Sequence, residues 1–254
     1  MRFSQIILVL LMLLAGLNAD AGPGLSTSDS PLDYLRNKGL EKDLEIIVED
    51  AEAFGELFEL IAASVEKDNS FYPALAWCQA LTESPIEITL KRGTSFLHAI
   101  DQVAESLGLS VVQAPWGCIM VNKRSREELN RIGEQISESD EKGTDNLTIG
   151  SIFTGNLWLI GVNPSDRSTL NFLEERITER SKVANRPYDV EIVWDNSSNP
   201  SSDLEPLINI LGTQSASFLG NWRVPRLLDT VCLFYNRSWE LREGVVYIVP
   251  RKKE

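Results

Sequence analysis

A strand, a helix and two closing strands are expected in the same order twice in this chain, and this repetition limits its fold most strongly. In the first occurrence, alternating apolar and polar residues predict a strand, and apolar residues at spacings of three and four predict a helix. Two short apolar runs around a Pro-Trp-Gly turn complete the unit. The expected elements lie at residues 86–90, 96–107, 109–112 and 118–121.

The second occurrence lies near the C-terminus. The same reasoning places its elements at residues 216–219, 225–235, 238–241 and 245–249. Superposing the two patterns pairs Asp101 with Asp229, Val103 with Val231, and Gly117 with Gly244. The shared order and helix length predict an internal duplication.

A strand and a helix are expected before each unit. They lie at residues 44–48 and 54–65 in the first half, and at 157–162 and from Leu170 onward in the second. Residues 188–194 add an alternating strand to the second half. At the corresponding place in the first half, the spacing of Leu75, Cys78 and Leu81 favours a helix.

These patterns predict an α+β fold of two small modules. Each module has a βα lead-in and a β-α-β-β unit, with its helices packed on small mixed sheets. A short helix at 125–136 and a stretch without apolar residues at 138–146 would connect the modules. The expected division is a signal peptide at 1–21, a flexible N-terminus with a short helix at 22–43, a first module at 44–124, a helix and linker at 125–155, and a second module at 156–254.

The N-terminus has the features of a cleavable secretory signal peptide. Arg2 supplies a positive charge, residues 6–14 are uniformly apolar, and small residues suited to cleavage end at Ala19 and Ala21. The apolar run is shorter than the roughly 20 residues that a membrane-spanning helix needs. We therefore expect an exported protein with no stable membrane span, located in the periplasm or, alternatively, outside the cell.

Composition restricts the partners of the mature chain. A hydrophobic content of 43% is sufficient for a packed core. The formal net charge of −13 disfavours nucleic acid and anionic lipid, because both require a basic surface. We expect neither as a partner.

Three cysteines and one histidine make a metal centre improbable. Cys78, Cys118 and Cys232 lack metal-ligand spacing, and His98 is the single histidine. The cysteines fit buried small hydrophobic residues, although one disulfide is an alternative in an oxidising compartment. The expected metal and cofactor content is therefore none.

The first unit resembles the short N-terminal domain of secretins and TonB-dependent receptors. The resemblance rests on the strand IEITL, the following Gly-Thr-Ser turn, the helix FLHAIDQVAESLGL and a hairpin that ends in CIMV. With the lead-ins, it extends over residues 44–123 and 157–251. The resemblance implies a βαβ plus βαββ fold that docks other envelope proteins, and it brings no catalytic or cofactor residue. The second unit departs from it by having Asn236-Arg237 at the helix end.

Enzyme signatures are missing from the sequence. It contains no Gly-x-Ser-x-Gly elbow, no phosphate-binding Gly-rich loop and no dinucleotide fingerprint. A carboxylate-dependent hydrolase remains an alternative because 37 acidic residues offer many pairs. Asp101 and Asp229 are the most distinctive acids, although a helix-surface position explains both more simply. We assign no catalytic residues.

The expected function is that of a non-enzymatic adaptor in the bacterial envelope, associated with a secretion or TonB-type uptake assembly. An exposed edge strand at 245–249 would extend the sheet of a partner protein. Carbohydrate binding is the alternative, because tryptophan rings stack on sugars. The candidate contact residues for a partner or a glycan are Trp116, Trp222 and Trp239.

Overall fold

The computed structural model supports a description of most of the first module and of the core of the second. The described residues are 30–50, 52–68, 72–78, 82–137, 151–153, 157–159, 171, 174–175, 191–195, 216–235, 237–243 and 245–251. The predicted signal peptide at 1–21 and the polar stretch at 138–146 lie outside them.

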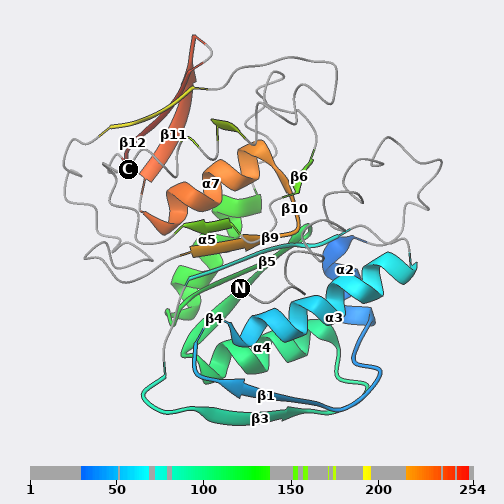
Figure 1. The fold of residues 1–254 in the computed structure, drawn as a ribbon. Coiled ribbons are helices and arrows are strands. Elements are labelled where there is room, and N and C mark those ends of the chain that lie inside the picture. The colour runs from blue at the N-terminus through cyan, green and yellow to red at the C-terminus, as the bar shows by residue number, and fades with distance from the viewer. Residues whose placement is uncertain are drawn as a thin grey trace.

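The first module has the order βαβ followed by βαββ. Strand β1 pairs antiparallel with β3, β2 pairs parallel with β5, and β4 pairs antiparallel with β5. Helices α3 and α4 lie between the two resulting sheets (Figure 1). The elements are β1 (Leu44–Val48), α3 (Ala53–Asp68), β2 (Ala74–Cys78), β3 (Ile86–Leu90), α4 (Phe96–Ser106), β4 (Leu109–Ala114) and β5 (Gly117–Asn122).

Local capping explains where the two helices begin and where α4 ends. The Asp50 carboxylate accepts a hydrogen bond from the backbone N–H of Glu52 at 2.7 Å, just before α3. The Ser95 hydroxyl accepts one from the backbone N–H of His98 and so caps α4. Gly108 ends α4 with φ of 68°, a conformation that glycine adopts without steric cost.

The second module has the same pairing pattern. Strand β7 pairs antiparallel with β9, β8 pairs parallel with β12, and β11 pairs antiparallel with β12. The short strands β6 and β10, which the sequence did not predict, pair with each other. The described elements are β6 (Ser151–Phe153), β7 (Leu157–Leu159), β8 (Glu191–Trp194), β9 (Ala216–Leu219), β10 (Asn221–Arg223), α7 (Val224–Phe234), β11 (Arg237–Arg242) and β12 (Val245–Pro250).

The helix and the two closing strands of the two units begin at positions displaced by a constant 128. Helices α4 and α7 begin at Phe96 and Val224, and β5 and β12 begin at Gly117 and Val245. The predicted match of Asp101 with Asp229 follows this displacement. The predicted match of Gly117 with Gly244 is wrong by one residue, because Gly117 pairs with the last residue of β4 just as Val245 pairs with the last residue of β11.

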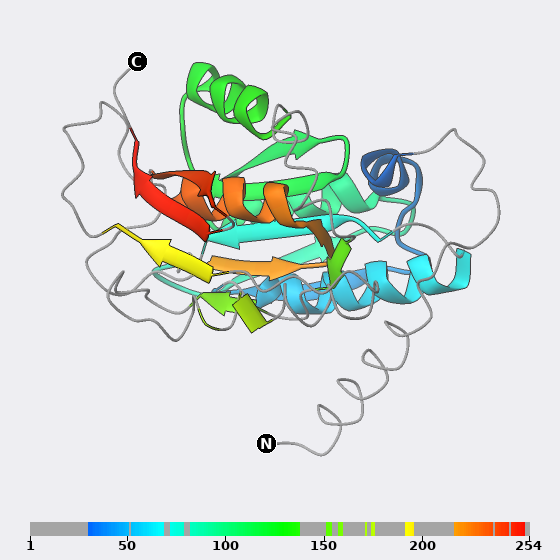
Figure 2. The same ribbon diagram turned by 90° about the horizontal axis from the view of Figure 1, so that it is seen from above.

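One five-stranded sheet joins the modules. Its order is β4-β5-β2-β9-β7, so the pairing of β2 with β9 connects the first module to the second. Helix α7 lies on one face of this sheet, and α3 and α4 lie on the other (Figures 1 and 2). The β1–β3 pair and the β11-β12-β8 sheet form the outer layers (Figure 1). The α+β prediction is therefore confirmed.

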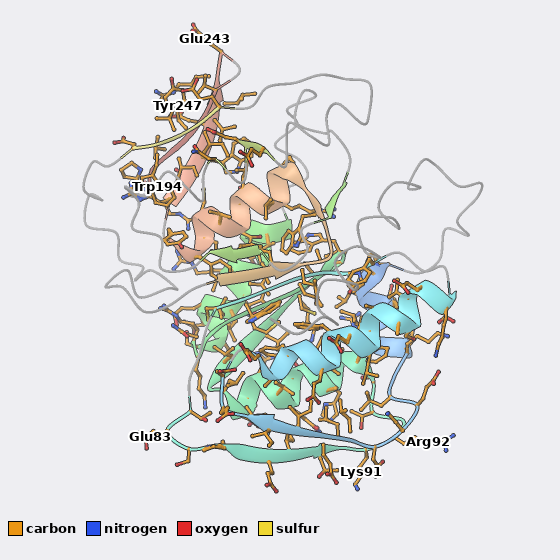
Figure 3. The ribbon with its side chains drawn as sticks, in the orientation of Figure 1. Glu83, Lys91, Arg92, Trp194, Glu243 and Tyr247 are labelled. Carbon is orange, nitrogen blue, oxygen red and sulfur yellow. The ribbon has the colours of Figure 1, made fainter. Side chains whose placement is uncertain are left out.

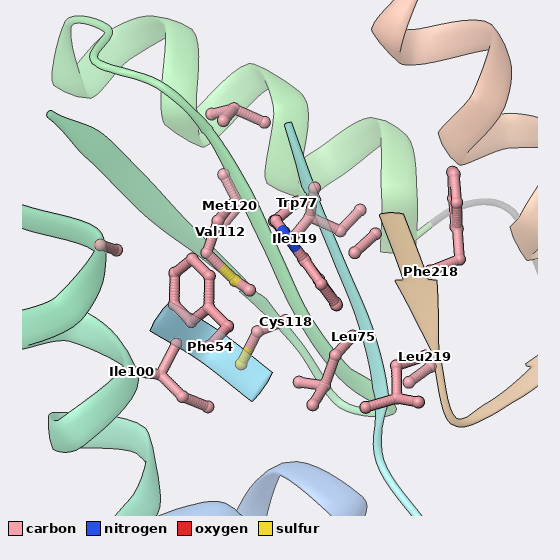
Figure 4. Close-up of a cluster of buried hydrophobic side chains, with 14 of the residues drawn as sticks. Phe54, Leu75, Trp77, Ile100, Val112, Cys118, Ile119, Met120, Phe218 and Leu219 are labelled. Carbon is pink, nitrogen blue, oxygen red and sulfur yellow. The ribbon is translucent and has the colours of Figure 1, made fainter. Parts of the chain in front are cut away.

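Strand β2 is buried along its whole length, and this corrects the helix expected there. All five residues from Ala74 to Cys78 are buried, because the strand is central in the sheet and has helices over both faces. Such strands have continuous apolar runs instead of alternation, so their period resembles that of a buried helix. Figure 4 shows side chains from α3, α4, β2, β5 and β9 packed around this centre.

Two further helices pack against this core. Helix α2 (Pro31–Asn37) starts with a capping box at Ser30 and Asp33, and the Tyr34 hydroxyl donates to the Ser64 hydroxyl of α3 at 2.7 Å. This helix lies within residues 22–43, where a short helix was expected, and the chain from residue 30 onward is part of the packed fold. Helix α5 (Arg126–Ser137) contacts β4 and α7 and therefore touches both modules.

Candidate protein-docking surface

The β1–β3 sheet has one face on the core and one face turned outward. Leu90, Ile46 and Val48 are buried against the helices, as the alternation of a half-buried strand requires. On the outward side, Glu45 lies opposite Thr89, and Ile47 lies opposite Glu87. We call these four exposed residues the outer face.

Two isoleucines make this sheet unusual on the surface of the described residues. Ile47 is 59% exposed on the outer face, and Ile86 is 43% exposed at the start of β3. They are the only large hydrophobic side chains that are exposed in the described part of the chain. Because Ile46 and Ile47 are adjacent in a strand, one of them must point away from the core. The sequence therefore shows that one of these two isoleucines faces outward, but not which one.

Charge is distributed unevenly around the sheet. Glu49 and Glu83 lie at one end, whereas Lys91 and Arg92 lie at the other (Figure 3). Asp43 accepts hydrogen bonds from the backbone N–H of Arg92 at 2.8 Å and from the Lys91 ammonium at 3.1 Å. These two bonds lower the pKa of the Asp43 carboxyl, the Arg92 bond most. With Glu45 and Glu87, the exposed isoleucines have an acidic border.

The tryptophans singled out in the sequence do not form a ligand platform. Trp116 is 4% exposed and Trp222 is fully buried, with their rings 5.1 Å apart in an edge-to-face contact. The Trp222 indole N–H donates to the Leu219 carbonyl at 3.1 Å. Both rings are buried and fill the junction between the modules, so neither is exposed to stack on a sugar. Trp239 is half-buried, and its indole N–H donates to an Asp229 carboxylate oxygen at 2.8 Å.

The two matching aspartates are not brought together. Asp101 is on α4 and Asp229 is on α7, and these helices lie on opposite faces of the five-stranded sheet (Figure 1). Burial raises the pKa of the half-buried Asp101 carboxyl. The Asp229 carboxylate holds the Trp239 ring. They cannot act as a carboxylate pair on one substrate.

The cysteines and the histidine have ordinary surroundings. All three cysteines are buried and none of them is in a disulfide bond, and burial raises the pKa of the Cys78 and Cys118 thiols to about 12. These two thiols are therefore protonated at neutral pH and are poor nucleophiles. The exposed His98 contacts the Gln102 side-chain amide at 3.0 Å. Over the described ranges, no three His, Cys, Asp or Glu side chains are grouped closely enough to hold a metal ion.

The expected edge strand at 245–249 is also corrected. Strand β12 is central in its sheet, between β11 and β8, so its backbone groups are paired on both sides. The hairpin partner β11 lies along one side of β12, and the parallel strand β8 lies along the other. Among the described helices, none combines the length and apolar composition needed to cross a membrane.

Comparison of the chain with protein-family models, curated proteins and solved structures gave no match.

Proposed function

We propose that this protein is an exported, non-enzymatic adaptor of the bacterial envelope, and that it docks another protein on the outer face of β1–β3. The observation that carries the proposal is the exposure of Ile47 on a sheet whose opposite face is packed. Exposed apolar side chains with a polar border are typical of protein contact sites. The resemblance to the secretin and TonB short N-terminal domain supports the same role and favours a partner that belongs to a secretion or uptake assembly.

Charge indicates the chemistry of the partner. Glu45 and Glu87 flank Ile47 on the outer face, and the whole chain has a net charge of −13. A partner surface with an aliphatic or aromatic centre and lysine or arginine around it would complement this face. Opposite charges of this kind increase the rate of encounter and select against acidic proteins.

Substitution of Ile47 tests the proposal. The mature protein is cross-linked in native envelope, and the proteins captured by wild type are compared with those captured by Ile47→Lys. We expect capture to fall at least about tenfold, because the substitution removes an apolar contact and adds a charge that a basic partner repels. The free energy of unfolding should change by less than about 0.5 kcal/mol, since Ile47 is exposed.

The matched control is Ala63→Lys, which makes the same change in charge at an exposed position of α3. It should leave capture unchanged. Equal capture by all three proteins would exclude the outer face as the docking site. A protein that captures nothing but hydrolyses a glycan or an ester would contradict the adaptor role itself.

A further inference from the structure

The sheet β11-β12-β8 has one face on α7 and one face turned away from it (Figure 1). Val246 and Ile248 of β12 point toward α7 and are fully buried. The residues that alternate with them point to the other side, because successive side chains of a strand lie on opposite faces. We call four half-buried residues on that side the distal face: Val193 of β8 and Val245, Tyr247 and Val249 of β12.

Strand β12 has the sequence of a strand that is covered on both faces. Its residues from Val245 to Val249 are apolar or aromatic without interruption. A sheet with one solvated face has polar residues at every second position, whereas strands buried on both faces have continuous apolar runs, as β2 does. The side chains of the distal face are nevertheless only half-buried.

The repeat shows what the same face does in the first module. Ile119 and Val121 of β5 precede Tyr247 and Val249 by 128 positions, and both are fully buried. Helix α5 packs on β4 beside them, and α7 lies over the same side of the sheet (Figures 1 and 2). The second module therefore keeps the apolar residues of this face, although they are less completely covered than in the first.

Charged residues lie on both margins of the distal face. Arg242 of β11 and Glu191 of β8 are paired with Val245 from its two sides, and both are exposed. Arg242 lies over the Tyr247 ring at 5.2 Å and contacts the Glu240 carboxylate. A guanidinium has five N–H donors, so it can bind a second carboxylate as well. One margin thus offers a cation and the other a carboxylate.

We propose that the distal faces of two copies pack against each other about a two-fold axis that runs along β12. This axis exchanges the two margins, so Arg242 of each copy faces Glu191 of the other. Tyr247 lies near the axis and covers its own counterpart. Sheets packed face to face are about 10 Å apart, a distance that an arginine and a glutamate side chain span together. A second copy therefore matches both margins, whereas a partner of one charge sign matches one.

The size of the distal face sets the strength of the contact. Three strands of up to six residues cover about 15 Å by 20 Å. This is less than the roughly 800 Å² that each partner buries in a stable interface, so association is weak and depends on concentration. The distal face and the outer face of β1–β3 lie at opposite ends of the molecule (Figure 3). Both outer faces therefore stay accessible in the dimer.

Sedimentation of the purified mature protein over about 1 μM to 1 mM, in about 0.15 M salt, tests this contact without any envelope partner. The mass of wild type should rise to that of a dimer and no further, because a two-fold contact uses the face of each copy once. Arg242→Glu and Glu191→Arg should each weaken association at least about tenfold, since the symmetry places each change at two contacts. The double variant should restore it.

The control Ala63→Lys changes the charge on α3 and should dimerise as wild type does. Unchanged circular dichroism of each variant confirms that the fold is retained. A monomer at every concentration, growth beyond the dimer, or single charge reversals that associate as wild type does would each overturn the inference.

The result is separate from the capture experiment, because only this protein is present. Ile47→Lys should dimerise as wild type does, since Ile47 lies at the other end of the molecule. A protein that dimerises but captures no envelope partner would support the inference and contradict the proposed function. A monomer that captures a partner would do the reverse.

Discussion

Replacing Trp222 by alanine should lower the free energy of unfolding by about 3–5 kcal/mol, the usual cost of removing a fully buried aromatic ring. The ring is fully buried, contacts Trp116 and Phe218 edge-to-face at 5.1 and 5.5 Å, and donates a hydrogen bond. Alanine leaves a cavity at the place where the two modules meet. Urea denaturation followed by circular dichroism measures the loss.

Trp239→Ala is the matched control for this prediction. Trp239 is half-buried and lies in β11, away from the junction, so its loss should cost less, about 1–3 kcal/mol. If Trp222→Ala stays within about 1 kcal/mol of wild type, the buried junction described above is incorrect.

Gly220→Ala should have the second large effect and should cost about 3 kcal/mol or more. Gly220 has φ of 97°, and a Cβ there would lie 2.0 Å from the Pro73 carbonyl oxygen. Strain at positive φ accounts for about 1–2 kcal/mol. The remainder arises because the backbone of the first module must move away from the second.

Gly93→Ala separates these two contributions. Gly93 also has a positive φ, of 84°, in the turn between β3 and α4, but a Cβ there meets nothing within 4 Å. It should therefore cost only the strain of about 1–2 kcal/mol. Equal losses for the two variants, measured by urea denaturation, would show that Gly220 does not approach the other module closely.

Local sequence patterns predicted the elements of the repeated unit well. The strands at Leu44–Val48, Ile86–Leu90 and Ala216–Leu219 have the expected bounds, because each alternates or ends at a turn residue. The constant displacement of the units was also visible, since Asp101 and Asp229 are at equivalent positions of α4 and α7. These features depend on neighbours close in the chain.

The features that depend on distant contacts could not be predicted in the same way. The spacing of apolar residues at strand β2 favoured a helix because burial on both faces removes the alternation that identifies a strand. The sequence placed Trp116 and Trp222 at turns or strand starts, where a ring could be exposed, but both rings are buried where the two modules meet. Apart from Gly220, no local sequence pattern indicates that β9 pairs with β2.

The same limit applies to the candidate docking surface. Ile47 lies in a predicted strand, but the sequence does not show which face of that strand is covered. Strand β12 was expected at an edge because its hairpin partner β11 was the only neighbour visible from the sequence. Its parallel pairing with β8 spans more than 50 residues of the chain. Non-local pairing of this kind has no short-range pattern.

The central claim is that pairing of β2 with β9 joins two repeated modules in one sheet. Nuclear Overhauser contacts between backbone protons of the deuterated full chain test it most directly. We expect cross-strand contacts between Leu75 and Leu219 and between Trp77 and Ser217, together with those inside each module. Contacts inside each module, with none between β2 and β9, would contradict the claim.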